Sequence, residues 1–427
     1  MQTSGALPEP PSFPGKGQPG PAAGLQPAGR AAPGLVAELQ IEARRLGFSR
    51  LGVAPAVTPP HHDALGRWLA AGLAGVMTDW MTRHELLRRD PAAVLPGARS
   101  IVMLATDHAR GRAATAEEPE PGRGRVARYA RGDDYHDLLR SRLNSLASWL
   151  EARLPGSQAR GVVDSAPLAE RDYGRLAGLG WFGKNTMLID PRAGSYFLLS
   201  ALLTTVDLPT DLPIAVDHCG TCTACLDACP TGALPEPRLL DATKCISALT
   251  IEDHAAVPPE LRVGMGDWIF GCDICQEVCP WNRHAPGSAE PAFQPRDAAE
   301  SLDLAAVLGL DEAGFRARFR GSPILRAKRR GLLRSAAIAL GNRPDPAALP
   351  ALAQAADDGE PAVRGAAAWA LGRWLAAGVA ADAVRQLLLA RAARETDATV
   401  LQEIEAACRG QVSSMSPDGS RPGPSAA

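Results

Sequence analysis

The sequence contains no apolar run of about 18 residues, so no segment is long enough to cross a lipid bilayer as a helix. It also lacks a large charge of either sign, since its formal net charge is −2. Residues 1–33 are rich in proline, glycine and alanine and lack the continuous apolar core of a secretory signal. These absences predict a soluble, cytoplasmic protein with no membrane partner and a disordered extension over residues 1–33.

Cysteine is nearly absent outside one segment, because eight of the nine cysteines lie between Cys219 and Cys279. A disulfide scaffold would spread its cysteines through a short secreted chain, whereas this chain has 427 residues and needs no such support. The crowding therefore predicts metal ligation in a reducing compartment. The ninth, Cys408, lies on a predicted apolar helix face, so we expect it to be a small core residue.

The spacing of the clustered cysteines indicates iron–sulfur clusters. The stretch "CGTCTACLDACP" has the pattern C-x2-C-x2-C-x3-C-P, in which the fourth cysteine binds a neighbouring cluster. The stretches "CDICQEVCP" and "TKCIS" supply four more cysteines. Zinc is the alternative, but it favours paired knuckles over this spacing. The crossed arrangement of two-cluster ferredoxins predicts one 4Fe-4S cluster on Cys219, Cys222, Cys225 and Cys279, and another on Cys229, Cys245, Cys272 and Cys275.

Hydrophobic patterning divides the rest of the chain. "LVAELQIEARRLGF" and "DYHDLLRSRLNSLASWLEARL" predict helices. "SRLGVAPA", "SIVMLATDH", "RGVVDSA", "NTMLID" and "SYFLLSALLTTV" predict strands, so residues 34–210 are predicted to form one α/β domain. Residues 211–295 then form a ferredoxin-like domain with both clusters. The predicted class is an α+β multidomain protein.

The C-terminal part is helical and repetitive. "LLRSAAIALGN" and "VRGAAAWALGRW" align 31 residues apart, from Gly341 to Gly372, which predicts a HEAT-like α-solenoid over residues 296–410. It begins with the run "FRARFRGSPILRAKRRGLLR", which has no acidic residue. A solvated face usually mixes charge signs, so this run predicts a polyanion partner such as nucleic acid. Residues 411–427 are predicted to be a disordered tail.

Three further motifs remain ambiguous. "GLGWFGKN" matches G-x-G-x-x-G, but Asn185 and the predicted strand that follows argue against a nucleotide site. Asp164 ends an apolar strand, where it either projects into a site or caps a helix beginning near Ala166. The arginines of "RGRVARYARGDDYH" either hold phosphates or solvate a loop, namely Arg123, Arg125, Arg128 and Arg131.

Taken together, "YARGDDYH", "DSAPLAERDYGRLAGLGWFGKNTMLI", "CGTCTACLDACPTGAL", "TKCISALTIE", "MGDWIFGCDICQEVCPWN" and "RAKRRGLLRSAAIALGN" resemble the epoxyqueuosine reductase family over about residues 34–375. The resemblance implies an enzyme that reduces epoxyqueuosine to queuosine at the wobble position of tRNA. It implies cobalamin in the α/β domain beside one of the clusters, and the tRNA anticodon arm on the basic, HEAT-like region. We also expect a monomer that takes electrons from a low-potential donor.

The resemblance further assigns residues. Asp164 of "VDSAP" is the expected proton donor, a role for which its pKa would be raised in a partly dry pocket. Reduction of an epoxide to an alkene needs two electrons and at least one proton, and cobalamin can collect electrons that clusters deliver singly. The residues expected to contact cobalamin are Arg88, Asp164, Lys184, Asn185 and Ser247, and those expected to contact tRNA are Arg326, Lys328, Arg329 and Arg330.

Two alternatives follow from the same motifs. A reductive dehalogenase would share cobalamin and two clusters, but would have an export signal and no HEAT-like array. A ferredoxin-type electron-transfer protein would need only the cysteine module, so its α/β domain would serve for docking.

Overall fold

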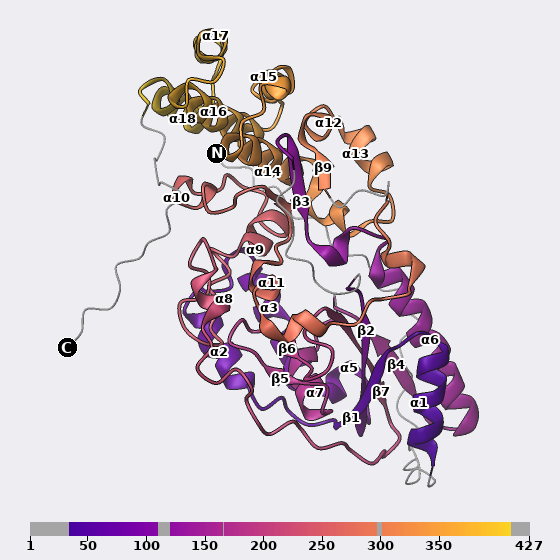
Figure 1. Ribbon diagram of the computed structural model, residues 1–427. Coiled ribbons are helices and arrows are strands. Elements are labelled where there is room, and N and C mark those ends of the chain that lie inside the picture. The colour runs from indigo at the N-terminus through magenta and orange to yellow at the C-terminus, as the bar shows by residue number, and fades with distance from the viewer. Residues whose placement is uncertain (1–33, 110–119, 165, 297–300, 411–427) are drawn as a thin grey trace, which may run out of the picture.

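The computed structural model describes residues 34–109, 120–164, 166–296 and 301–410. The predicted extension over 1–33 and the predicted tail over 411–427 lie outside these ranges. In Figure 1 the α/β part, with its sheet, lies below, the cysteine region lies beside it, and the C-terminal helices lie above. None of the helices within the described ranges is both long and apolar enough to span a membrane.

The main sheet has the strand order β1-β2-β7-β4, and every neighbouring pair is antiparallel. Its strands occupy four of the segments that the hydrophobic pattern predicts. They are β1 (Arg50–Pro55), β2 (Ser100–Asp107), β4 (Ala159–Val162) and β7 (Phe197–Thr204).

Helices cover both faces of this sheet. Alternate residues of β2 point to opposite sides, so Val102 packs in one core and Met103 in another. The first core includes α1 (Leu35–Arg45) and α6 (Tyr135–Arg153), both predicted from the sequence and seen beside the sheet in Figure 1. The second includes α5 (Pro91–Val94) and α7 (Glu170–Leu176). Between β1 and α5 lie α2 (His62–Ala70), α3 (Thr78–Arg83) and α4 (Glu85–Arg89).

The "GLGWFGKN" glycines belong to a small hairpin. Strand β5 (Trp181–Phe182) pairs with β6 (Leu188–Ile189), and the Gly183 N–H donates to the Met187 carbonyl at 2.8 Å. A side chain at Gly180 would place its Cβ 2.4 Å from the Ile189 carbonyl oxygen. The glycines therefore allow close backbone packing, and a strand follows the motif as predicted rather than a phosphate-binding helix.

A second sheet joins three parts of the chain. Its order is β8-β3-β9, from β3 (Arg123–Val126), β8 (Trp268–Phe270) and β9 (Ser301–Asp303). Arg125 and Arg128 reach Glu277 at 3.3 and 3.4 Å.

The other two arginines of the "RGRVARYARGDDYH" stretch also make contacts within the chain. Arg123 Nη2 donates to the Ser301 carbonyl at 2.6 Å, and Arg131 Nε donates to the Val126 carbonyl at 2.9 Å. Arg123, Arg125 and Arg128 thus fasten this stretch to β9 and the cysteine region, whereas the Arg131 bond lies within the stretch itself.

The cysteine region consists of short helices and loops. Its helices are α8 (Ala224–Asp227), α9 (Ile246–Ile251), α10 (Pro259–Arg262) and α11 (Ile274–Glu277). The C-terminal helices are α12 (Leu304–Leu308), α13 (Glu312–Arg318), α14 (Lys328–Asn342), α15 (Leu349–Ala355), α16 (Pro361–Ala376), α17 (Ala381–Ala392) and α18 (Ala398–Cys408).

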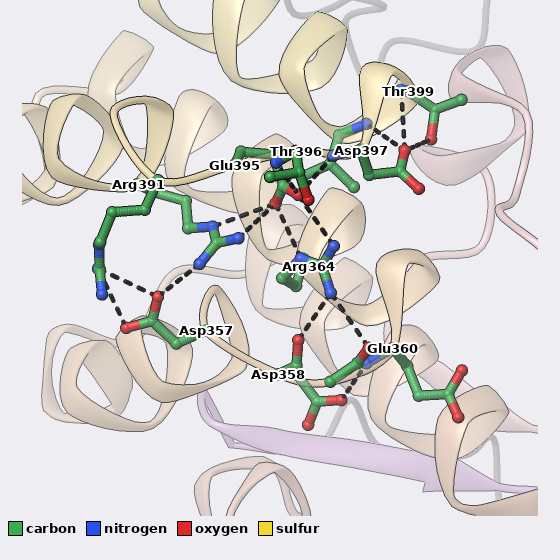
Figure 2. Close-up of polar contacts among 12 residues, drawn as sticks. Asp357, Asp358, Glu360, Arg364, Arg391, Glu395, Thr396, Asp397 and Thr399 are labelled. Atoms are coloured by element: carbon green, nitrogen blue, oxygen red, sulfur yellow. Dashed lines mark hydrogen bonds and ion pairs between the residues drawn. The ribbon is translucent and has the colours of Figure 1, made fainter.

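An ion-pair network holds the last helices together (Figure 2). The fully buried Glu395 side chain accepts from Arg364 of α16 at 2.8 Å and from Arg391 of α17 at 2.7 Å. Arg391 also pairs with Asp357 at 3.0 Å. A buried carboxylate is costly without partners. The two ion pairs of Glu395 compensate for its burial and join α16 to α17.

The aligned Ala-Leu-Gly segments lie on α14 and α16, where small residues allow close packing. We predict that Gly341→Ala destabilises the chain by about 1–3 kcal/mol, because the new Cβ would lie 2.5 Å from Trp369 Cζ3. Denaturant unfolding followed by tryptophan fluorescence measures the change. The matched control is Gly365→Ala on α16, where the nearest atom lies at 3.7 Å and a gain of about 0.5–1 kcal/mol is expected. Equal stabilities of the two variants would contradict the packing account.

Cys408 is exposed, so the prediction of a core position is wrong. The buried face of α18 is formed by Val400, Ile404 and Ala407. Cys408 is the last residue of the helix and lies one position past this face. Helical periodicity places a residue only to within a neighbouring position at a helix end.

Candidate functional site

The first predicted set of cysteines lines one cavity. Cys219, Cys222 and Cys225 form its wall together with Cys279, which lies more than fifty positions further along the chain, as the crossed arrangement requires. Lys184 lines the same cavity, and its Nζ donates to the Gly220 carbonyl at 2.7 Å.

The cysteines of the second predicted set interact electrostatically. Burial raises the pKa of Cys275, and the charges of Cys245, Cys225 and Cys229 add to the rise, so sulfurs of both predicted sets lie within electrostatic range of Cys275. Burial likewise raises the pKa of Cys245, with a further rise from the charge of Cys229. Cys272 is linked in the same way to Cys275. The assignment of each cysteine to one cluster stays a prediction.

The cysteine arrangement suits a cluster better than a single ion. Within the described ranges, no three Cys, His, Asp or Glu side chains converge on a point where one metal ion would fit. The first set instead surrounds a cavity. A 4Fe-4S cluster spreads its ligands over four irons, whereas zinc draws four ligands to one centre.

Three residues predicted to contact cobalamin lie beside the cysteines. Lys184 and Asn185 line the first cysteine cavity. Asn185 Nδ2 donates to the Cys275 carbonyl at 3.2 Å, which links the β5–β6 turn to the second set. Hydrogen bonds from Ser247 oppose the rise that burial causes in the pKa of Cys245, so Ser247 contacts that sulfur. A contact of these three residues with cobalamin stays a prediction.

Asp164 lies in the loop after β4 and does not cap a helix. Helix α7 begins only at Glu170, with Ala169 as its N-cap, so the capping interpretation is wrong. The Asp164 backbone has φ 41°, in the left-handed region that costs energy for a residue other than glycine. Its N–H donates to Glu170 Oε1 at 2.9 Å, which helps to hold this conformation.

Two neighbours of Asp164 were not identified as site residues from the sequence. Tyr135 Oη donates to Asp164 Oδ2 at 2.5 Å, and His136 Nε2 lies 3.2 Å from the same oxygen. Asp134 is the N-cap of α6, so both residues occupy the first turn of that helix. The signal was the "DDYH" stretch at the start of a predicted helix, which presents two polar aromatic side chains at a helix end.

The ionisation of Asp164 differs from the prediction. Burial acts to raise the pKa of Asp164, but hydrogen bonds from His136 and Tyr135 outweigh burial, so the pKa is lowered. Burial acts to lower the pKa of His136, but hydrogen bonds with Asp134 and Asp164 raise it to about 9. The prediction of a raised Asp164 pKa is therefore wrong, because it considered burial without partners.

Asp164 lies among several charged side chains, which together are called the Asp164 site below: His136, Glu170, Arg171, Arg88 and Arg326. The Asp164 side chain is 59% exposed and Arg171 is exposed, yet burial is the first cause acting on the pKa of both residues. Each side chain therefore lies against protein atoms on one side and is accessible to solvent on the other. Burial also raises the pKa of Glu170 to about 8, with a further contribution from the charge of Asp164.

Arg171 interacts electrostatically with both the Asp164 site and the second cysteine set. Burial lowers the pKa of Arg171, and the charges of Asp164 and Glu170 act against that change. The charges of Cys275 and Cys245 act in the same direction, so the acid and these cysteines lie within electrostatic range of one guanidinium. Arg88 also lies near Asp164, and its buried Nε has no hydrogen-bond partner.

In the basic run, Arg326 is the residue found within electrostatic range of Asp164. Burial acts to lower the pKa of Arg326, but a hydrogen bond with Glu252 raises it, and the charge of Asp164 adds to the rise. Lys328 follows with φ 56°, a strained backbone between η6 (Pro323–Ala327) and α14. Arg329 is held by Asp358 and by the Leu310 carbonyl at 2.7 Å. Arg330 lies 4.0 Å from Glu360.

Arg334 does not belong to a polyanion surface, although the charge run included it. Its side chain is fully buried, and Nη1 donates to the Asp253 carbonyl at 2.9 Å. Further bonds to the Leu249 and Ala255 carbonyls make it a strut between α14 and the chain after α9. The sequence could not show this, because burial depends on which helix face meets the cysteine region.

A cysteine module joined to helical repeats and to an α/β part defines an iron–sulfur oxidoreductase with a C-terminal helical array. Family models agree, with a 4Fe-4S double cluster binding domain at residues 218–282 and HEAT repeats at 323–409. A third model, "Epoxyqueuosine reductase QueG, DUF1730", matches residues 88–165.

Relatives point to the same family. The epoxyqueuosine reductase of Pseudomonas aeruginosa is 43% identical over 302 residues, which cover 70% of this chain and 83% of that protein. The Escherichia coli enzyme is 41% identical over 300 residues, covering 70% and 79%. The chain belongs to the epoxyqueuosine reductase family, and the predicted resemblance is confirmed.

Solved structures share the whole fold. A crystal structure of epoxyqueuosine reductase with an epoxyqueuosine-modified tRNA stem loop matches with a TM-score of 0.80 at 32% identity, covering 88% of this chain and 98% of that one. The Streptococcus thermophilus enzyme matches with a TM-score of 0.77 at 27% identity, covering 88% and 99%. The predicted fold class is confirmed.

Proposed function

We propose that this oxidoreductase reduces epoxyqueuosine to queuosine at the wobble position of tRNA, with cobalamin and two 4Fe-4S clusters. The main support is that the chain belongs to the epoxyqueuosine reductase family, together with Arg171, on whose pKa the charges of Asp164, Cys245 and Cys275 all act. An acid and a cysteine set for an electron source that lie within range of one side chain suit a reaction that consumes both protons and electrons.

The residues of the Asp164 site fit cobalamin. The corrin ring is rimmed with amides, which accept hydrogen bonds from guanidinium groups, and Arg88 Nε is buried without a partner. Arg88 and Arg171 would hold the rim, and Ser247 and Asn185 would support it from the cluster side. When bound, cobalamin supplies a low-potential centre that gathers electrons delivered singly by the clusters.

The protein groups then divide the remaining work. The cysteine sets would hold the clusters, which would pass electrons from the surface, where Cys222 is exposed, towards the Asp164 site. Tyr135 fixes the Asp164 carboxyl group by its hydrogen bond. Asp164 gives a proton to the departing epoxide oxygen. Arg326 lies within electrostatic range of Asp164 and would bring an RNA phosphate near the Asp164 site.

Cobalamin titration tests the cofactor assignment. Anaerobically purified protein with both clusters should bind added cobalamin at one equivalent per chain, followed by the visible spectrum. Arg88→Gln and Arg171→Gln should each weaken binding by about tenfold, since each loses one or two charge-assisted hydrogen bonds. A cluster-loaded protein that leaves the cobalamin spectrum unchanged would exclude this function.

Neutralising two half-buried cations of the basic run should weaken tRNA binding. We predict that Lys328→Gln and Arg330→Gln each lower the slope of log K against log salt by about 0.7–0.9, because each removes one phosphate contact. Filter binding at several salt concentrations measures the slope. Arg45→Gln, an exposed arginine of α1 paired with Glu42, is the control. An unchanged slope in both variants would place the RNA elsewhere.

A further inference from the structure

The reaction needs more protons than Asp164 can hold. When an epoxide becomes an alkene, both C–O bonds break, a C=C bond forms, and two electrons and two protons convert the oxygen to water. The clusters supply the electrons, whereas one carboxyl group holds at most one proton. Moreover, Asp164 has a lowered pKa because of its partners. A second group must therefore store a proton within reach of Asp164.

We propose that His136 is the proton reservoir of this site, which loads Asp164 and replaces the proton that Asp164 transfers. This inference rests on the proposed role of Asp164 as proton donor. The support is the position of the imidazole between two carboxylates. Nδ1 lies 2.7 Å from Asp134 Oδ1, and Nε2 lies 3.2 Å from Asp164 Oδ2.

Both ring nitrogens of His136 face acceptors. A neutral imidazole has one N–H and one lone pair, so it would direct its lone pair at one of the two carboxylates. The charged imidazolium donates from both nitrogens and satisfies both carboxylates. The geometry therefore favours a stored proton, in agreement with the pKa of about 9.

The His136 ring is held in place and can take up a new proton from solvent. His136 stacks on Tyr135 with ring centroids 4.1 Å apart and planes inclined by 24°, and Tyr135 is itself bonded to Asp164. The side chains of His136 and Asp134 are 25% and 28% exposed. Solvent can thus return a proton from the Asp134 side while the substrate occupies the Asp164 side.

The other charged groups described near His136 and Asp164 do not serve as the proton reservoir. Glu170 Oε1 accepts from the Asp164 backbone N–H and makes no hydrogen bond to its carboxyl group in the described structure. Arg88 of α4 and Arg326 of η6 keep their charge at neutral pH, so they bias the pair without supplying protons. Arg140 of α6 acts on Asp134 through its charge. His136 and Asp164 then titrate as one coupled pair.

The test is the pH dependence of a single turnover. In the wild type, the rate should fall as the pH rises through about 9, where His136 loses its proton. His136→Gln removes the reservoir and the hydrogen bond that lowers the Asp164 pKa, so burial would raise that pKa. The variant should stay within about threefold of the wild type near pH 6 and lose about tenfold or more at pH 8.5.

Controls separate this inference from the proposed function. His284→Gln changes an exposed histidine and should keep the wild-type pH profile. Imidazole added to His136→Gly should restore the rate at pH 8.5, which a merely structural defect would not allow. A His136→Gln profile that matches the wild type, while Asp164→Asn is inactive, overturns the inference alone. An active Asp164→Asn overturns the role of Asp164 as proton donor, on which the inference rests, whereas wild-type protein that forms no queuosine overturns the proposed function itself.

Discussion

Asp164→Asn is expected to slow queuosine formation in a single turnover by about 10²–10⁴-fold, because an amide cannot give a proton to the epoxide oxygen. Asparagine keeps the size of the side chain and can still accept from Tyr135 Oη, which bonds Asp164 at 2.5 Å. Cluster content and cobalamin binding should therefore stay at wild-type levels. Quenched-flow sampling followed by nucleoside mass analysis measures the rate.

Asp172→Asn is the matched control for this result. Asp172 lies in α7, but it pairs with His61 at 2.5 Å and is not part of the Asp164 site. Its variant should turn over normally. If Asp164→Asn matched this control while binding both cofactors, another group would have to supply the proton.

The second large effect concerns Cys279. Cys279→Ser should remove one whole cluster, lower the iron content from about eight to about four per chain, and abolish turnover, because electrons lose one of two relay sites. Iron analysis and the spectrum of the reduced protein measure the loss. Cys408→Ser, at an exposed cysteine outside both sets, should leave both clusters intact.

Double variants test the crossed pairing directly. Cys225 and Cys279 line one cavity, so their double variant should keep about four irons, as each single variant does. Combining Cys225→Ser with Cys229→Ser should remove all of the iron, because these residues belong to different crossed sets. The reverse pattern would contradict the crossed arrangement and require a sequential one.

The features with short-range or periodic signals could be predicted from the sequence. Continuous apolar runs mark β2 and β7, which are buried along most of their length, and the cysteine spacing anticipates a first set whose four members line one cavity. The Ala-Leu-Gly repeat anticipates α14 and α16. The resemblance selected Asp164, although its residue type and position alone suggested a helix cap.

The remaining features depend on contacts between distant segments. Tyr135 and His136 come from the start of α6, and Asp164 from the loop after β4, so no local pattern links them. The sign of the Asp164 pKa shift follows from these partners rather than from burial. The prediction that Arg334 belongs to a polyanion-binding run is wrong for the same reason. Only tertiary packing shows that carbonyl groups enclose its side chain.

The most direct test of the central claim is the anaerobic reaction of epoxyqueuosine-containing tRNA with the cluster-loaded protein and a strong reductant, with and without cobalamin. The nucleosides are then separated, and their masses are measured by mass spectrometry. The account predicts a loss of 16 Da, the mass of one oxygen atom, only when cobalamin is present. Unchanged epoxyqueuosine with all components present, or full conversion without cobalamin, would contradict it.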